Sequence, residues 1–108
     1  KSIQQLNVEF LRALRGCEDI FGRTAFRRPA DIGWRDQFLT GMYDAQMVAV
    51  SACSDAEIQD AINNKKNILE SIRNEFRNNK IFEAAVREAT NTPSRIRERI
   101  NRVSALLK

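Results

Sequence analysis

Apolar residues recur every three or four positions along most of this chain, and this spacing restricts its fold more than any other feature. Residues three and four apart lie on the same face of an α-helix, so the pattern predicts amphipathic helices. Over residues 2–22, Ser2 is a good N-cap, Gly22 is a good helix end, and Gly16 marks a candidate kink because glycine is a poor helix former. The apolar positions of this first helix are Ile3, Leu6, Phe10, Leu14 (or Ala13), Cys17 and Phe21.

A connector at residues 23–33 leads to the second predicted helix. This helix is expected to begin at Trp34 or Arg35 and to end at Ala52. Apolar residues cover most of its circumference, which is typical of a helix with neighbours on several sides. We therefore predict a central helix near residues 35–52.

Three further helices complete the predicted bundle. Ser54-Asp55-Ala56-Glu57 is a capping box that opens a long helix. Lys65 occupies an apolar position of this helix, so either the helix bends at residues 63–66 or the Lys65 side chain snorkels to solvent. A short helix follows, and its predicted buried face consists of Ile81, Phe82, Ala85, Val86 and Ala89. The pair Thr92-Pro93 starts the last helix. No segment is a convincing strand, so the predicted fold is all-α: a compact bundle of about five helices in a single domain over residues 1–108.

Length and composition fit one folded domain. The chain has 108 residues, of which 43% are hydrophobic and 30% charged, as is ordinary for globular proteins. It begins with Lys1 instead of Met, so we expect it to be a fragment of a longer protein. Cys17 and Cys53 lie in helical patterns without CxxC spacing, which predicts reduced core cysteines and suits a cytoplasmic protein. No apolar run approaches the roughly 20 residues of a membrane span.

The chain contains no histidine, and this excludes several kinds of catalytic and metal site. Nucleophiles of the Ser-His and Cys-His kinds lack their base, and two cysteines without histidine cannot supply the usual four zinc ligands. The glycines are scattered, so there is no glycine-rich phosphate loop. We predict that this chain by itself is not an enzyme and has no catalytic residue, no metal site and no cofactor.

Arginines are the strongest candidates for a binding role in a chain with 18 basic and 14 acidic residues. Arg95, Arg99 and Arg102, spaced by four and three, are predicted along one edge of the last helix, beside its apolar stripe. Guanidinium groups bind phosphates through forked donors, so this edge is a candidate contact for the DNA backbone, with Arg27 and Arg28 of the connector as further candidates. The alternative is that these arginines pair with carboxylates on neighbouring helices or remain solvated.

Several segments resemble one family of bacterial defence proteins. The run IFGRTAFRRP at residues 20–29 is similar to that family's IFG..AFR.P segment, and FLTGMYDAQMV at residues 38–48 is similar to its ALF.A.MV helix. SDAEI at residues 54–58 resembles its LS.EEI helix start, and residues 82–99 resemble its F..AI..GT.S...V..R pattern. By the order and spacing of these segments, the chain resembles the ParB/sulfiredoxin-like superfamily of modification-dependent restriction proteins, typified by the GmrSD enzymes.

The resemblance implies a place in a longer protein. It makes this chain the C-terminal helical region of a restriction or phage-defence protein, preceded in that family by a domain whose DGQQR-type motif is associated with nucleotide hydrolysis. Some members also carry an HNH-type nuclease part. Neither motif occurs here, so no catalytic residue of the family carries over, and Ala89 replaces the glycine that precedes the family's threonine.

The leading hypothesis is therefore a non-catalytic helical domain that serves as a scaffold and contacts the DNA backbone. Its expected partners are the N-terminal domain of the same protein, DNA and a second copy of the chain, with no membrane. The alternative is a protein-interaction or oligomerisation module unrelated to DNA. That alternative predicts an exposed apolar patch and stable dimers.

Overall fold

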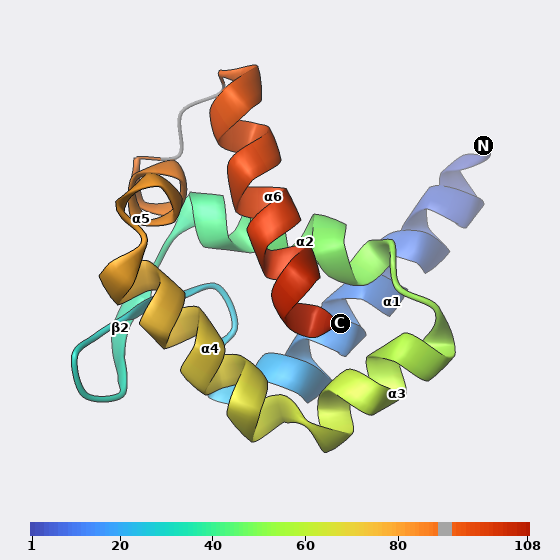
Figure 1. Ribbon diagram of the computed structural model, residues 1–108. Coiled ribbons are helices and arrows are strands. Elements are labelled where there is room, and N and C mark those ends of the chain that lie inside the picture. The colour runs from blue at the N-terminus through green and yellow to red at the C-terminus, as the bar shows by residue number, and fades with distance from the viewer. Residues whose placement is uncertain (89–91) are drawn as a thin grey trace.

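In the computed structural model, which describes residues 1–88 and 92–108, helices account for most of the chain and two short strands form a hairpin (Figure 1). The predicted helical bundle is confirmed, with the hairpin as an addition. The elements in chain order are α1 (Ile3–Phe21), a 3₁₀ turn η1 (Gly22–Thr24), β1 (Arg27–Pro29), β2 (Trp34–Phe38), α2 (Thr40–Ser51), α3 (Asp55–Asn63), α4 (Lys65–Asn78), α5 (Lys80–Arg87) and α6 (Pro93–Leu107).

Helix α1 begins and ends where its sequence predicts. Ser2 Oγ accepts a hydrogen bond from the Gln5 amide, the Gln5 side chain accepts one from the Ser2 amide, and Gly22 caps the other end with a φ of 58°. The helix continues without interruption through Gly16, where a Cβ would lie 2.6 Å from Val50 Cγ1. Glycine there lets α2 approach α1 closely. The first half of α1 extends beyond the bundle (Figure 1).

Helix α2 is the central helix of the bundle. It contacts α1, α5, α6 and β1, and Figure 1 shows α6 in front of it and α1 behind it. The predicted central helix is thus confirmed for residues 40–51. Its first turn comes so close to α5 that a Cβ on Gly41 would collide with the Val86 carbonyl. The buried residues of α2 are Gly41, Met42, Ala45, Gln46, Met47, Ala49 and Val50.

The prediction that this helix begins at residue 34 or 35 was wrong, as was the prediction that the chain has no strand. Residues 34–38 form β2, which pairs antiparallel with β1. Trp34 and Phe38 are four residues apart, and this spacing places two side chains on the same face of either a helix or a strand. Gly33, with a φ of 71°, supplies the left-handed residue of the connecting turn. Because β2 pairs with β1 across that turn, residues 34–38 adopt the strand and not the helix.

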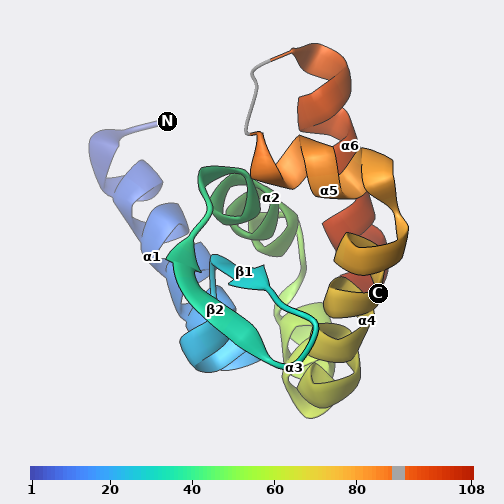
Figure 2. The same ribbon diagram turned by 90° about the vertical axis from the view of Figure 1, so that its left-hand side faces the viewer.

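Phe26 anchors the base of the hairpin on α2. Its φ is 65°, a conformation that costs free energy in a residue other than glycine and persists only where the surroundings stabilise it. Gln46 Oε1 accepts a hydrogen bond from the Phe26 amide, and the Phe26 carbonyl accepts one from the Leu39 amide, both at 2.8 Å. The Phe26 ring lies edge-on to Tyr43 with 4.9 Å between centroids. The hairpin is therefore fastened to α2, below which it is drawn in Figure 2.

The long helix predicted after residue 54 is divided in two. Helix α3 begins at the predicted capping box, in which the Glu57 amide donates to Ser54 Oγ at 3.1 Å and the Ser54 amide donates to Glu57 Oε1 at 2.9 Å. The chain then leaves helical geometry at Asn64 before α4 begins. The predicted bend at residues 63–66 is confirmed.

Helices α5 and α6 complete the bundle. Ile81 of α5 is 68% exposed, so its predicted burial was wrong, and Ala89 lies outside the described residues. Helix α6 begins at Pro93, as predicted, and buries Val103 and Leu107 against the core. Helices α4 and α5 pack against each other, and both lie on the side of the bundle where the hairpin is (Figure 2).

Candidate anion-binding pocket

Arg99, the middle residue of the predicted arginine edge, is buried between helices. Only 4% of the residue is accessible, and its Nε and Nη2 each lie 3.0 Å from the same carboxylate oxygen of Asp44 in α2. Its Nη1 donates to the Ala85 carbonyl at 3.2 Å. The guanidinium therefore joins α6 to α2 and α5, and these donors face protein and not solvent.

Arg95 and Arg102 lie beside carboxylates as well. Arg95 Nη1 is 3.1 Å from Glu88 Oε2. Arg102 Nε is 3.8 Å from Glu75 Oε2 in α4, and its Nη2 is 3.8 Å from Glu98 Oε1. Pairing with acids on neighbouring helices was the alternative that the sequence left open. Together with the burial of Arg99, it means that the three arginines form no continuous exposed edge.

The two connector arginines lie on the hairpin. Arg27 Nε is 3.6 Å from Asp36 Oδ1 in β2. Arg28 forms no ion pair with a carboxylate of the described residues, and its guanidinium carbon lies 5.5 Å from the centre of the Phe76 ring in α4. Of the five arginines predicted to bind DNA, Arg28 lines a pocket.

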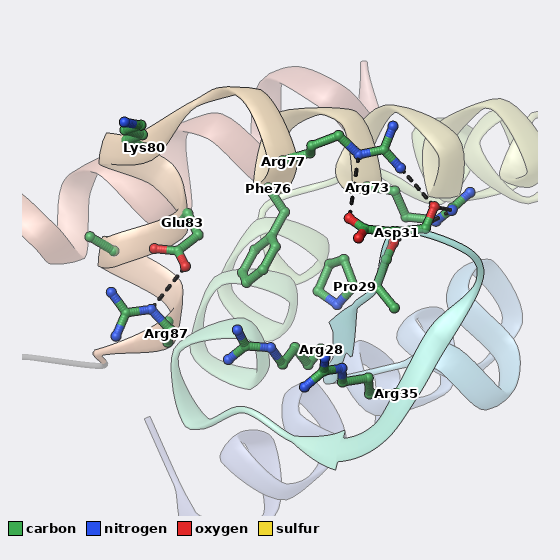
Figure 3. A pocket seen from close by; sticks show the side chains of 12 residues that line it. Arg28, Pro29, Asp31, Arg35, Arg73, Phe76, Arg77, Lys80, Glu83 and Arg87 are labelled. Carbon is green, nitrogen blue, oxygen red and sulfur yellow. Dashed lines mark hydrogen bonds and ion pairs between the residues drawn. The ribbon is translucent and has the colours of Figure 1, made fainter.

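This pocket, of about 590 Å³, lies between the hairpin, α4 and α5 (Figure 3). We call it the basic pocket; its volume is in the range of small-ligand sites. Pro29, Phe76 and Ala84 contribute apolar surface, and Asp31 and Glu83 contribute carboxylates. Six cations outnumber these two acids, an excess of four that equals the formal charge of the whole chain. The cations are Arg28, Arg35, Arg73, Arg77, Lys80 and Arg87.

Three of the six cations are engaged in hydrogen bonds or ion pairs within the protein. Arg73 Nη2 and Arg77 Nη2 each donate to the Asp31 carbonyl at 2.8 Å, which fastens the hairpin loop to α4. Arg87 Nε donates to Glu83 Oε2 at 2.9 Å, and this hydrogen bond raises the pKa of Arg87 above its ordinary value. The charge of Arg87 is thereby offset in part by a carboxylate.

The other three cations, Arg28, Arg35 and Lys80, have no ion pair with any carboxylate in the part of the chain that the structure describes. They come from β1, β2 and the start of α5. Figure 3 shows Arg28 and Arg35 together on the hairpin side of the hollow and Lys80 on the α5 side. Hydrogen-bond donors of three separate elements are therefore available to a ligand.

The contribution of α4 and α5 to this pocket was missed in the sequence. Arg73, Arg77 and Lys80 are spaced by four and three, the same spacing that singled out the last helix. The spacing of basic residues was therefore visible in the sequence. It did not show whether this set or the arginines of the last helix would lie near Arg27 and Arg28. That choice depends on the packing of α4 against β1.

Two other kinds of site, a metal-ligand group and a reactive cysteine, are absent from the described residues. Within residues 1–88 and 92–108 no group of three or more His, Cys, Asp or Glu side chains could hold a metal ion. Cys17 and Cys53 are both buried and unbridged, as predicted. Burial, with a smaller contribution from Glu18, raises the pKa of Cys17 to about 12, and burial likewise raises the pKa of Cys53. Both are protonated thiols at neutral pH and therefore poor nucleophiles.

No helix in the described part of the chain is long and apolar enough to cross a membrane.

Comparison of the chain with family models, with curated proteins and with solved structures finds no match. The resemblance to modification-dependent restriction proteins stays a prediction. The basic pocket is thus the feature from which a function can be inferred.

Proposed function

We propose that this chain is a non-catalytic helical domain that contacts the phosphate backbone of DNA through the basic pocket. The proposal keeps the DNA contact inferred from the arginines and moves its centre from α6 to the hairpin, α4 and α5. It fits a place in a bacterial restriction or phage-defence protein, as the resemblance implies. The observation that carries it is the gathering of three unpaired cations around one hollow.

Unpaired cations are better phosphate ligands than paired ones. A cation that already contacts a carboxylate loses that interaction when a phosphate approaches, whereas an unpaired one exchanges only water and counterions. Arg28 is also positioned in advance, because its guanidinium lies over the Phe76 ring. Less side-chain entropy is then lost on binding. Arg35 adds a second forked donor, and Lys80 adds a point charge from α5.

Replacing Arg28, Arg35 and Lys80 together with alanine is expected to weaken binding to a short DNA duplex. Each phosphate contact contributes about one unit to the slope of log affinity against log salt concentration. The slope should therefore fall by about three if all three side chains contact phosphates. Fluorescence anisotropy of a labelled duplex, titrated with protein at several salt concentrations, measures both quantities.

The matched control replaces Lys65, Lys66 and Arg97 with alanine. These side chains are exposed, lie outside the pocket and form no ion pair with a described residue, so the control removes the same charge elsewhere. It is expected to keep most of the slope. Equal losses in both triple variants, with unchanged circular dichroism, would mean that net charge alone attracts DNA, and the pocket proposal would be wrong.

A second candidate function, self-association, is favoured by the first half of α1. Ile3 is 78% exposed, Leu6 52% and Phe10 47%. Their spacing places them on one face of the part of α1 that extends beyond the bundle (Figure 1). An apolar stripe without a partner is typical of a protein contact, and a two-fold axis would pair it with the same stripe of a second copy.

Replacing Leu6 and Phe10 with glutamate is expected to turn dimers of this chain into monomers, because buried carboxylates would then face each other across the two-fold axis. Sedimentation velocity over a range of protein concentrations measures the change. Ile81→Glu is the control, since Ile81 is an exposed apolar residue of α5 that should leave dimers intact. An unsubstituted protein that sediments as a monomer at every concentration would contradict self-association.

A further inference from the structure

The basic pocket carries more positive charge than one backbone phosphate requires, and we propose that it binds a terminal phosphate group of a DNA strand. This inference rests on the proposed DNA contact and specifies which phosphate enters the pocket. A phosphodiester within a strand carries one negative charge. A phosphomonoester at a strand end carries nearly two at neutral pH and presents three unbridged oxygens.

The arrangement of the unpaired cations favours an end over the middle of a strand. Arg28, Arg35 and Lys80 belong to three elements, so they approach the hollow from more than one side (Figure 3). A phosphate inside a duplex has a nucleotide on each side along the strand, and these neighbours keep it on the surface of a pocket. A terminal phosphate has one such neighbour and can enter. A concave basic surface also concentrates the electric field on an anion inside it.

The side chains match the chemistry of a phosphomonoester. Arg28 and Arg35 provide forked guanidinium donors that bind two oxygens at once, and Lys80 adds a positive charge on the α5 side of the same hollow. Pro29 and Phe76 line the same hollow, and the small part of their apolar surface that is exposed faces the ligand. A volume of about 590 Å³ leaves room for the last nucleotide as well as for its phosphate.

The two carboxylates indicate where in the pocket the phosphate lies. Glu83 is hydrogen-bonded to Arg87 on α5, and Asp31 lies at the rim, with its side chain 98% exposed. Carboxylates repel a phosphate, so the region around Glu83 and Arg87 is the less favourable one. The phosphate is therefore placed beside Arg28 and Arg35, and Lys80, on the α5 side of the hollow, adds positive charge at a greater distance (Figure 3).

The test compares duplexes of one sequence whose ends carry hydroxyl groups, 5′-phosphates or 3′-phosphates. Fluorescence anisotropy is expected to show binding about ten-fold tighter for a phosphorylated duplex, the size of effect that charge-assisted hydrogen bonds give. The preference should disappear when Arg28, Arg35 and Lys80 are replaced with alanine, and persist in the control variant of Lys65, Lys66 and Arg97. It should also shrink between pH 7 and pH 5, because a phosphomonoester takes up a proton near pH 6.

The outcomes separate this inference from the proposed function. Equal affinity for all three duplexes, with binding still weakened by the pocket variant, would overturn the terminal-phosphate inference and leave the DNA contact standing. Failure of every duplex to bind at low salt would overturn both. A deoxynucleoside 5′-monophosphate that competes as well as the phosphorylated duplex would support a terminal-phosphate site and contradict DNA as its partner.

Discussion

Replacing Asp44 with alanine is expected to destabilise the protein by about 3 kcal/mol, because Arg99 would keep its charge in the interior without this carboxylate. The Arg99 side chain is only 5% exposed, so its charge depends on acceptors within the protein. The Asp44 side chain is 37% exposed, which puts the effect at the lower end of the range for broken buried ion pairs. Urea unfolding followed by circular dichroism should show a lower midpoint at an unchanged m-value.

Two further variants separate charge from packing in this prediction. Combining Asp44→Leu with Arg99→Met removes both charges, and it is expected to recover much of the loss because apolar replacements of buried ion pairs are often neutral. Asp36→Ala removes a carboxylate whose side chain is 98% exposed, and should cost less than about 1 kcal/mol. If Asp44→Ala costs no more than Asp36→Ala, solvent reaches Arg99 and the structural interpretation is wrong.

The position of Arg99 could have been read more accurately from the sequence. It follows Ile96 by three residues and precedes Val103 by four, so it falls on the apolar stripe of the last helix and not merely beside it. A buried cation on such a stripe needs an acceptor on a neighbouring helix. The partner, Asp44, is 55 residues away in the chain, and no local pattern could have identified it.

Helix ends set by side-chain caps were predictable, whereas the hairpin was not. The caps at Ser2 and Ser54 involve residues three positions apart, so the sequence contains both partners of each contact. The strand at residues 34–38 depends on pairing with residues 27–29 across a turn, and its aromatic spacing fits a helix equally well. Local sequence patterns thus predicted the helix caps. The choice between helix and strand at residues 34–38 depended on pairing with a separate segment, which a local pattern does not contain.

The basic pocket is a product of tertiary packing for the same reason. Its unpaired cations lie at positions 28, 35 and 80, and each is unremarkable in its own segment. The last helix shows an equally regular arginine stripe, yet acids on α4 and α6 and at Glu88 lie against Arg95 and Arg102. The difference between an available cation and a paired one comes from carboxylates that the fold brings near.

Gly41→Ala is expected to destabilise the protein by about 3 kcal/mol, as a severe case of overpacking. Gly41 lies in the first turn of α2, and a Cβ there would collide with the carbonyl oxygen and carbon of Val86 in α5. These are backbone atoms, so no change of rotamer can relieve the collision. The two helices must move apart, and Phe82, which is fully buried, then loses contacts with the core. Urea unfolding measures the lowered midpoint.

Gly16→Ala provides the comparison, because the obstacle there is a side chain. Its Cβ would lie 2.6 Å from Val50 Cγ1, an atom that Val50→Ala removes. The double variant with Gly16→Ala and Val50→Ala should be more stable than Val50→Ala alone. The methyl group added at position 16 would fill part of the cavity that Val50→Ala leaves, and alanine is more favourable than glycine in a helix by about 1 kcal/mol. Val86→Ala should not rescue Gly41→Ala, because the backbone of α5 remains in place. Rescue would show that the Val86 side chain limits the approach of α2 to α5, and would contradict the backbone explanation.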